Sequence, residues 1–231
     1  MNLHPRRFIR PALGTLCVAT LAALQACNGD ACFGVDVCFN NNNNTQTVAL
    51  SGTAATGDAL ASAQVTVSCV TGSATTLTDG GGNYRVTVNA ALPCVITVTS
   101  GRTSLHSLAY AGGTFNTTPE TELMLVYLAA QLGTNTAALI GNFQGNPRYQ
   151  QAMNSPNTVQ AAQSAVVTSL QQRYSVTLTA PAFLTTSFTV GQPGVDSDLV
   201  ALAKAGAIDT NGMPDPAAVA LLTQAGAAHP L

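Results

Sequence analysis

From residue 47 to about residue 115, apolar and polar side chains alternate with a period of two residues. Glycine, aspartate, asparagine and proline interrupt the alternation at short intervals, as they do in turns between strands. Because successive side chains of a strand point to opposite faces, the pattern predicts short antiparallel strands that pack as a sandwich. The predicted inward faces are Val65, Val67 and Cys69 on one strand, Tyr84, Val86 and Val88 on another, and Cys94, Ile96 and Val98 on a third.

The pattern changes at residue 116, and the rest of the chain is predicted to be helical. Thr118 and Pro119 are residues that favour the N-cap and the first position of a helix, so a helix is expected from there to about Leu132. Residues 123–130 are apolar on every side, which predicts burial between the sandwich and later helices.

Further helices are expected where a proline begins, or a glycine ends, a stretch of helical spacing. One begins after Pro156, and its apolar residues recur every three to four positions, which predicts a single packed face. That face is Val159, Ala162, Val166, Leu170 and Tyr174. The shorter predicted helices are 136–142, 196–205, which stops near Gly206, and 216–225, which stops near Gly226.

These patterns place the chain in the α+β class, with an N-terminal antiparallel β-sandwich followed by a C-terminal helical region. The length allows one compact domain or two small ones, and we expect two, 47–115 and 116–231, each with its own core. Residues 27–46 are expected to form a tether, because the asparagine run at 40–44 is typical of a spacer.

The amino end has the organisation of an export signal. Three arginines and no acid precede an apolar stretch at 13–26. That stretch is shorter than the ~20 residues that a membrane-spanning helix needs, so a signal peptide over residues 1–26 is predicted.

The motif Leu24-Gln25-Ala26-Cys27 resembles the lipobox of bacterial lipoproteins, although Gln25 replaces a small residue. The resemblance implies cleavage before Cys27 and lipidation of its thiol, so that the lipid anchors the chain to a membrane. Asn28 is not the aspartate that retains such lipoproteins in the inner membrane, which implies outer-membrane anchoring on the periplasmic or the surface face. The alternative is an ordinary signal peptide cut near Ala26 or Ala31, with Cys27 in a disulfide.

The remaining cysteines are Cys32, Cys38, Cys69 and Cys94, if Cys17 leaves with the signal. An even number of cysteines in an exported chain favours disulfides. Cys69 and Cys94 lie on inward faces of neighbouring predicted strands, which favours a bridge between them, and two buried thiols are the alternative. A Cys32–Cys38 bridge would close a short loop in the tether. Four cysteines permit three pairings, and the sequence does not select among them.

The segment "SGTAATGDALASAQVTVSC", followed by "TLTDGGGNYRVTV", resembles the carboxypeptidase regulatory-like, or transthyretin-like, β-sandwich domains. Ala61, Ser62 and Ala63 stand at a corner where proline and glycine are common in that family. The resemblance covers about residues 47–110 and implies an Ig-like sandwich, an accessory role and no reaction. With the helical continuation "TFNTTPETELMLVYLAAQL", the chain is similar to uncharacterised Gram-negative lipoproteins.

The charge balance narrows the range of partners. Three of the eight basic residues lie in the predicted signal peptide, so five remain against ten acids. The five are Arg85, Arg102, Arg148, Arg173 and Lys204. This distribution argues against nucleic acid as a partner, because such binding needs clustered Lys and Arg. Membrane contact is expected through the lipid anchor alone.

Residues that would carry catalysis are few. His106 and His229 are the histidines after the signal, and no nucleophile elbow, zinc-binding His pair or phosphate-binding glycine fingerprint occurs. His106 is expected on a strand that begins after Gly101, as a sheet-face residue. Glu120 and Glu122 diverge by ~200° on a helix and are not expected to act together. We therefore predict no enzymatic activity.

No metal or cofactor is expected either. The segments 79–83 and 209–215 carry several oxygens but lack the acidic spacing of a calcium loop, so turns are predicted there. Tyr84 and Tyr110 would form a sugar-binding platform if exposed, but packing is the favoured role.

The sequence thus predicts a noncatalytic cell-envelope lipoprotein with a binding or structural role toward an envelope protein or a glycan. One alternative is a glycan- or peptidoglycan-binding module, with the sandwich as the binding surface. Another is an unrecognised envelope hydrolase that uses His106, Asp196 or Asp198.

Overall fold

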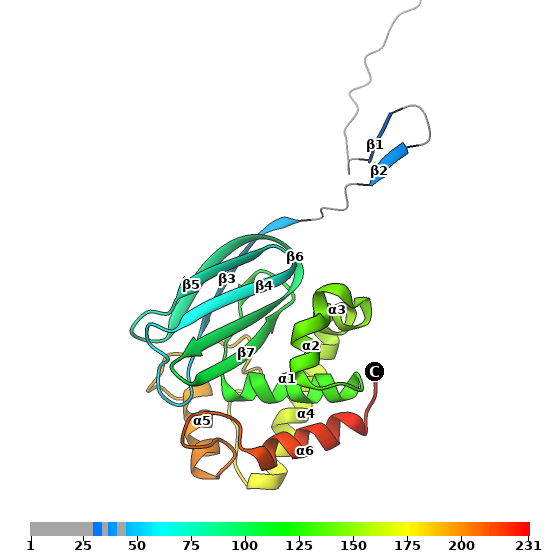
Figure 1. Ribbon diagram of the computed structural model, residues 1–231. Coiled ribbons are helices and arrows are strands. Elements are labelled where there is room, and N and C mark those ends of the chain that lie inside the picture. The colour runs from blue at the N-terminus through cyan, green and yellow to red at the C-terminus, as the bar shows by residue number, and fades with distance from the viewer. Residues whose placement is uncertain (1–29, 34–36, 41–44) are drawn as a thin grey trace, which may run out of the picture. The chain divides into compact units, whose positions relative to one another are not determined.

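The computed structural model describes residues 30–33, 37–40 and 45–231, which fall into two units, 1–42 and 43–231 (Figure 1). The smaller unit contains strands β1 (Asp30–Phe33) and β2 (Val37–Asn40), which pair antiparallel with Cys32 opposite Cys38. The predicted bridge between these two cysteines stays a prediction. The predicted signal peptide and Cys27 lie outside the described residues.

A six-stranded, mostly antiparallel sheet forms the first part of the larger unit. Its order is β5-β4-β6-β3-β8, and β7 also pairs with β6. The long strand β6 serves two ladders, because its first half pairs with β3 and its second half pairs with β4 and β7. The strands are β3 (Gln46–Thr53), β4 (Gln64–Thr71), β5 (Ser73–Leu77), β6 (Asn83–Ser100), β7 (Thr103–Ala109) and β8 (Gly113–Thr114).

The inward faces predicted from the period of two are confirmed, since every side chain named for the three strands is buried. Cys69 of β4 lies directly opposite Cys94 of β6, and a disulfide joins them, as the sequence favoured. In the chain-entropy model, closing a loop of this length stabilises the fold by about 3 kcal/mol. The disulfide therefore adds to the stability that the buried strand faces already provide.

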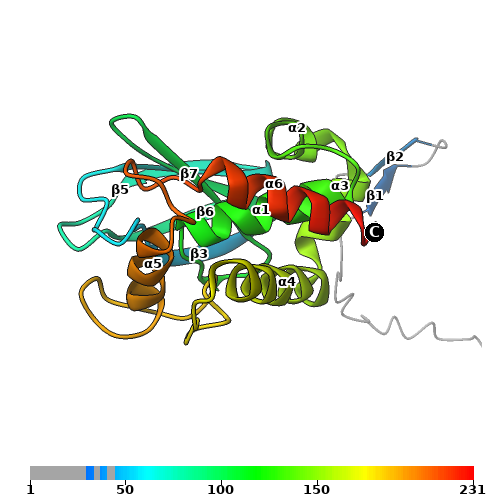
Figure 2. The ribbon, with the colours of Figure 1, turned by 90° about the horizontal axis from the view of Figure 1, so that it is seen from below.

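Helices follow the sheet. They are α1 (Pro119–Gln131), α2 (Thr136–Asn142), a 3-10 turn η1 (Phe143–Gly145), α3 (Pro147–Asn154), α4 (Pro156–Tyr174), α5 (Val195–Lys204) and α6 (Pro216–Ala227). Helix α1 packs against β7 on one side and against α4 and α6 on the other (Figures 1 and 2). All its residues except Glu122 are buried, which confirms the burial predicted from its apolar sequence.

One hydrophobic core runs through the sheet and the helices. It includes Ile96 of the sheet, Leu125 of α1 and Leu170 of α4, all almost inaccessible to solvent. The predicted boundary at residues 115 and 116 marks the change from strands to helices, and that change occurs within one compact unit with a shared core.

Two details of the helical part differ from the prediction. The sequence pattern does not predict α3 and η1, whose residues are mostly polar, although Asn146 caps α3 with its side chain. Gly226 does not end α6 but lies inside it. The reason is close packing, since a Cβ at Gly226 would lie 2.4 Å from the carbonyl oxygen of Tyr127 in α1.

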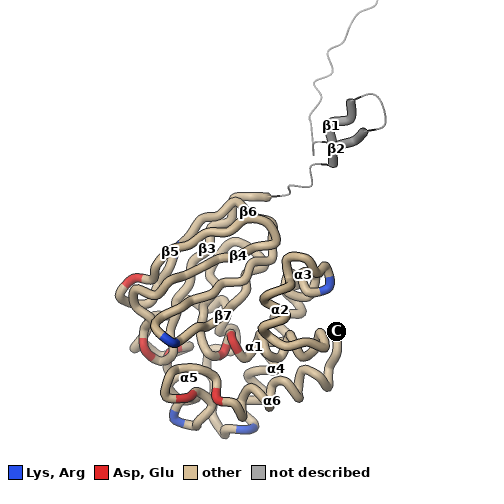
Figure 3. The backbone as a smooth tube through the Cα atoms, in the orientation of Figure 1, with Lys and Arg blue, Asp and Glu red and all other residues tan. Residues whose placement is uncertain are grey.

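Charged residues are sparse along the larger unit, and most of those visible in Figure 3 lie toward the end where α5 is found. Among the described residues, no single helix is both long and apolar enough to cross a membrane. Helix α1 together with α2 and η1 has a suitable length and composition, but the two parts meet at 84°.

Candidate functional site

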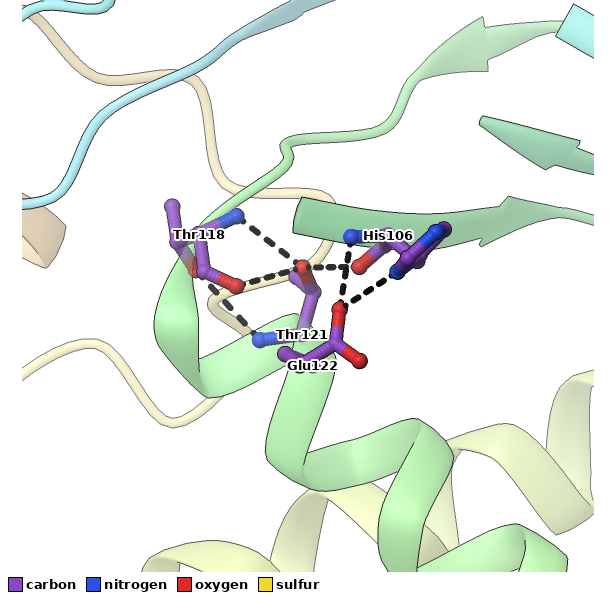
Figure 4. Close-up of polar contacts among 4 residues, drawn as sticks. All are labelled: His106, Thr118, Thr121 and Glu122. Carbon is purple, nitrogen blue, oxygen red and sulfur yellow. Dashed lines mark hydrogen bonds and ion pairs between the residues drawn. The ribbon is translucent and has the colours of Figure 1, made fainter. Parts of the chain in front are cut away.

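His106, one of the two histidines considered for catalysis, lies in β7 beside the first turn of α1, on the strand predicted for it. Its Nδ1 is 2.9 Å from Oε2 of Glu122, and its backbone N–H donates to the same oxygen at 2.7 Å (Figure 4). The hydroxyl of Thr121 donates to the carbonyl oxygen of His106 at 2.9 Å. Both backbone groups of His106 are therefore bonded to side chains of α1.

These contacts give hydrogen-bond partners to backbone groups at one edge of β7. In the described part of the chain, β7 pairs with β6 alone, so its other edge presents backbone groups that need partners. Glu122 and Thr121 supply those partners at His106, where a further strand would otherwise pair. The contact between the two side chains is partly buried, with 23% of the His106 side chain and 14% of the Glu122 side chain exposed. The arrangement fastens the helix to the sheet.

The start of α1 is fixed by its own polar residues. Thr118 is the N-cap, its hydroxyl accepts from the N–H of Thr121 at 3.4 Å, and its N–H donates to the hydroxyl of Thr121 at 3.0 Å (Figure 4). This reciprocal pairing satisfies donors that a helix start leaves open. The predicted cap at Thr118 is confirmed, and the same turn holds β7.

The surroundings of His106 do not form a catalytic triad. Nucleophilic catalysis needs a hydroxyl or thiol hydrogen-bonded to the base. In the stretch 45–231, the hydrogen-bond partner of the imidazole is the Glu122 carboxylate. The backbone of His229, the other histidine, accepts from the side chain of Gln131 at 2.9 Å near the end of α6.

Glu120 points into the protein rather than toward Glu122. Its residue is 1% exposed, and its Oε2 has no hydrogen-bond partner among the residues that the structure describes. Burial, together with the nearby charge of Asp198, raises the pKa of Glu120 well above its ordinary value. The two glutamates thus lie in separate environments, as the geometry of a helix predicts.

Asp196 and Asp198, considered for a hydrolase, are buried at the start of α5. One carboxylate oxygen of Asp198 accepts from the N–H groups of Thr179 and Ala180, both at 2.8 Å, and the other accepts from the Thr179 hydroxyl at 3.0 Å. Oδ2 of Asp196 accepts from the N–H of Gly191 at 2.8 Å. These carboxylates hold the chain that leads into α5.

Asp79 and Asp209, considered for calcium, bind the amides of their own turns. Oδ1 of Asp79 accepts from the N–H groups of Asn83 and Gly81 at 2.8 and 2.9 Å. Oδ1 of Asp209 accepts from those of Met213 and Asn211 at 2.9 and 2.8 Å. These backbone hydrogen bonds lower the pKa of both carboxyls. In the described ranges, no three His, Cys, Asp or Glu residues are grouped to hold a metal ion.

The tyrosines proposed for a sugar platform are used in packing. Tyr84 is 3% exposed, its hydroxyl donates to the carbonyl oxygen of Phe115, and burial raises its pKa. Tyr110 packs edge-on against Phe115, with ring centroids 5.2 Å apart. The packing role favoured from the sequence is therefore what the structure shows for both rings.

Two surface hollows, of about 420 and 540 Å³, adjoin along β3 on the side where it pairs with β8, and both reach Arg85 of β6. Ser51 and Arg85 line both of them. The sequence pattern marks these two positions as outward-facing, but it does not bring in Phe188, which comes from a loop far along the chain and lines the first hollow. Both polar and apolar residues line the two hollows.

Comparison of the chain with models of known protein families, with curated proteins and with solved structures finds no match.

Proposed function

We propose that the chain is a noncatalytic lipoprotein of the bacterial cell envelope, anchored by a lipid on Cys27, whose folded unit has a binding or structural role. The observation that carries the proposal is the disulfide between Cys69 and Cys94 inside the core. Disulfides persist in oxidising compartments outside the cytoplasm, so a disulfide in the folded part fits an export signal at the amino end.

The lipobox-like motif before Cys27 supports the anchor, and Asn28 supports outer-membrane placement on the periplasmic or the surface face. The lipid is then the membrane contact. The partner is an envelope protein or a glycan, and the five scattered bases left after the signal give no reason to propose nucleic acid.

We also propose that residues 47–115 form a transthyretin-like sandwich of the carboxypeptidase regulatory-like kind. The sharing of β6 between two ladders supports this assignment. So does the backbone of Ser62, whose φ of 51° lies in the left-handed region that favours glycine. This is the corner where the family commonly carries glycine and proline, and the family supplies accessory modules.

The uses already found for the candidate catalytic groups support a noncatalytic role. His106 is bonded to α1, Asp198 holds a loop by three hydrogen bonds, and Asp196 accepts a hydrogen bond from the N–H of Gly191. A hydrolase that used His106, Asp196 or Asp198 would also need a nucleophile hydrogen-bonded to its base. Detection of hydrolytic activity that is lost in His106→Ala would replace the proposal with that alternative.

The anchor is tested by intact-mass analysis of the native product and by labelling with radioactive palmitate. We expect a chain that begins at an acylated Cys27, and Cys27→Ser should remove both the label and sedimentation with membranes. Cys17→Ser is the matched control, because that residue leaves with the signal. An unmodified start, or a retained initiator methionine, would contradict the proposal.

The binding role is tested by cross-linking in intact cells, followed by recovery of the tagged protein and identification of what is attached. Reproducible recovery of an envelope protein or of cell-wall glycan supports it. Recovery of the protein alone, under conditions that cross-link a known envelope complex in the same cells, counts against it.

A further inference from the structure

The outer face of β3 and of the first half of β6 is polar. Antiparallel pairing places side chains of the two strands opposite each other on that face. The outward pairs are Thr47 with Asn89, Ala49 with Thr87, and Ser51 with Arg85. Thr114 of β8 extends the row, because its hydroxyl lies 3.3 Å from that of Ser51. The face therefore offers hydroxyls, amides and one guanidinium.

Two hollows adjoin each other beside this face, since Ser51 and Arg85 line both. The first extends toward the turn at Asn83 and the loop that carries Phe188, and the second follows β3 back to Gln46. Together they form a groove beside β3, which is ~23 Å long from its first to its last residue at ~3.3 Å per residue. That length accommodates several units of an extended polymer.

Arg85 is the cation of this groove. It is exposed, and it forms no ion pair with any residue in the described ranges. Asp79 also lines the groove, but its carboxylate already accepts hydrogen bonds from its turn and from the side chain of Asn83. A guanidinium presents donors in a planar fork that matches a carboxylate. The groove is thus suited to a ligand that carries a carboxylate among many hydroxyls.

We propose that this groove binds an oligosaccharide that carries carboxylate groups. Arg85 contacts a carboxylate, while the hydroxyls of Ser51 and Thr114 exchange hydrogen bonds with sugar hydroxyls. Phe188, which is partly exposed and lines the first hollow, is the aromatic residue on which a sugar ring would stack. The inference rests on the binding role proposed above and names the site and the ligand class for it.

The backbone of β3 favours a glycan over an extended peptide. A peptide that adds to a sheet edge needs free backbone groups along it. The carbonyl oxygens of Ser51 and Thr53 already accept from the N–H groups of Phe115 and Thr117 at 2.8 and 3.0 Å. The N–H of Thr53 donates to the side chain of Asn116 at 3.1 Å. The edge is therefore occupied at the first hollow, and recognition there falls to the outward side chains.

The test is affinity electrophoresis of the detergent-solubilised full-length protein in gels that contain polygalacturonate, a polymer of carboxylated sugars, or neutral dextran. We expect retardation by polygalacturonate and not by dextran. Arg85→Gln should weaken the interaction about tenfold, the typical effect of one charge-assisted hydrogen bond. Arg102→Gln is the matched control, because Arg102 is exposed at the turn between β6 and β7, outside the groove.

Several outcomes would overturn the proposal. These are the absence of retardation, equal retardation by dextran, and equal weakening by Arg85→Gln and Arg102→Gln, which would indicate general attraction between charges. Displacement of the polymer by a short acidic peptide at the same concentration of carboxylates would assign the groove to a peptide instead. The binding assay uses purified protein, so a negative result does not contradict the lipid anchor at Cys27. Equally, absence of the anchor does not contradict binding of the polymer by the groove.

Discussion

We expect Glu120→Gln to remove a pH dependence from the stability of the larger unit. Glu120 is buried in α1 and faces the carboxylate of Asp198, so its pKa in the folded state is raised well above the value of 4.5 for a free glutamate. In the unfolded chain the carboxyl is in water and titrates near that ordinary value. The folded state therefore holds one more proton than the unfolded state across the interval between the two pKa values.

The sign and size of the effect follow from this difference. A group whose pKa is raised by folding contributes its full stabilisation below the unfolded pKa and loses it as the pH rises through the folded pKa. Because the folded state binds one more proton within this interval, the free energy of unfolding falls by about 1.4 kcal/mol for each unit by which the pH rises. Glutamine has nearly the same shape and no proton to lose, so the variant lacks this contribution.

The measurement is the free energy of urea unfolding of both proteins at several values between about pH 5 and pH 8, below the range in which tyrosines titrate. The difference, variant minus wild type, should rise with pH at about 1.4 kcal/mol per unit while Glu120 stays protonated in the folded protein. Asp58→Asn is the control, because Asp58 is exposed. Two parallel stability curves would refute the reasoning and would place Glu120 in contact with water.

Other variants test the packing and the caps. Gly226→Ala should destabilise the protein by about 1 to 3 kcal/mol through overpacking against α1. Gly141 in α2 has open space around it, so Gly141→Ala should be neutral or stabilising. Thermal unfolding of the two variants measures the difference. Replacement of Cys69 and Cys94 together by alanine should lower the urea midpoint, with a loss of about 3 kcal/mol, and an unchanged midpoint would contradict the disulfide. Thr118→Ala should lower the free energy of unfolding by about 1 kcal/mol in the same assay, whereas Thr118→Ser, which keeps a capping hydroxyl, should retain most of the stability.

The elements that the sequence predicts well are those whose signal is local. The strand faces around Val65 and Ile96 follow from a period of two, and the start of α1 follows from Thr118 and Pro119. Each of these signals lies within a few residues of the structure it specifies. For the same reason the sequence favours the disulfide, since both cysteines lie on inward faces of predicted strands, although it does not select among the three possible pairings.

The parts that the sequence does not predict depend on residues distant in the chain. Gly226 has the local signature of a helix end, but contact with Tyr127 of α1 gives it another role. The groove around Arg85 needs Phe188, which is brought to the same face by folding. The sequence predicts that Glu122 points away from Glu120. It does not predict the contact of Glu122 with His106, because His106 lies on another element. The spacing of two residues on one helix gives the angle between their side chains, but the residues that each side chain contacts depend on the tertiary fold.

The polar residues in the first turn of α1 fix the rotation of the helix about its own axis. A helix that is apolar on every side gains the same burial in any rotation about its axis, so hydrophobic packing alone does not select one. Hydrogen bonds are directional, and Thr121 and Glu122 reach the backbone of His106 in one rotation only. Glu120 then faces inward, toward Asp198, because it lies two residues before Glu122 on the same helix. The burial of one carboxyl is thus a consequence of the contacts that dock the helix on the sheet.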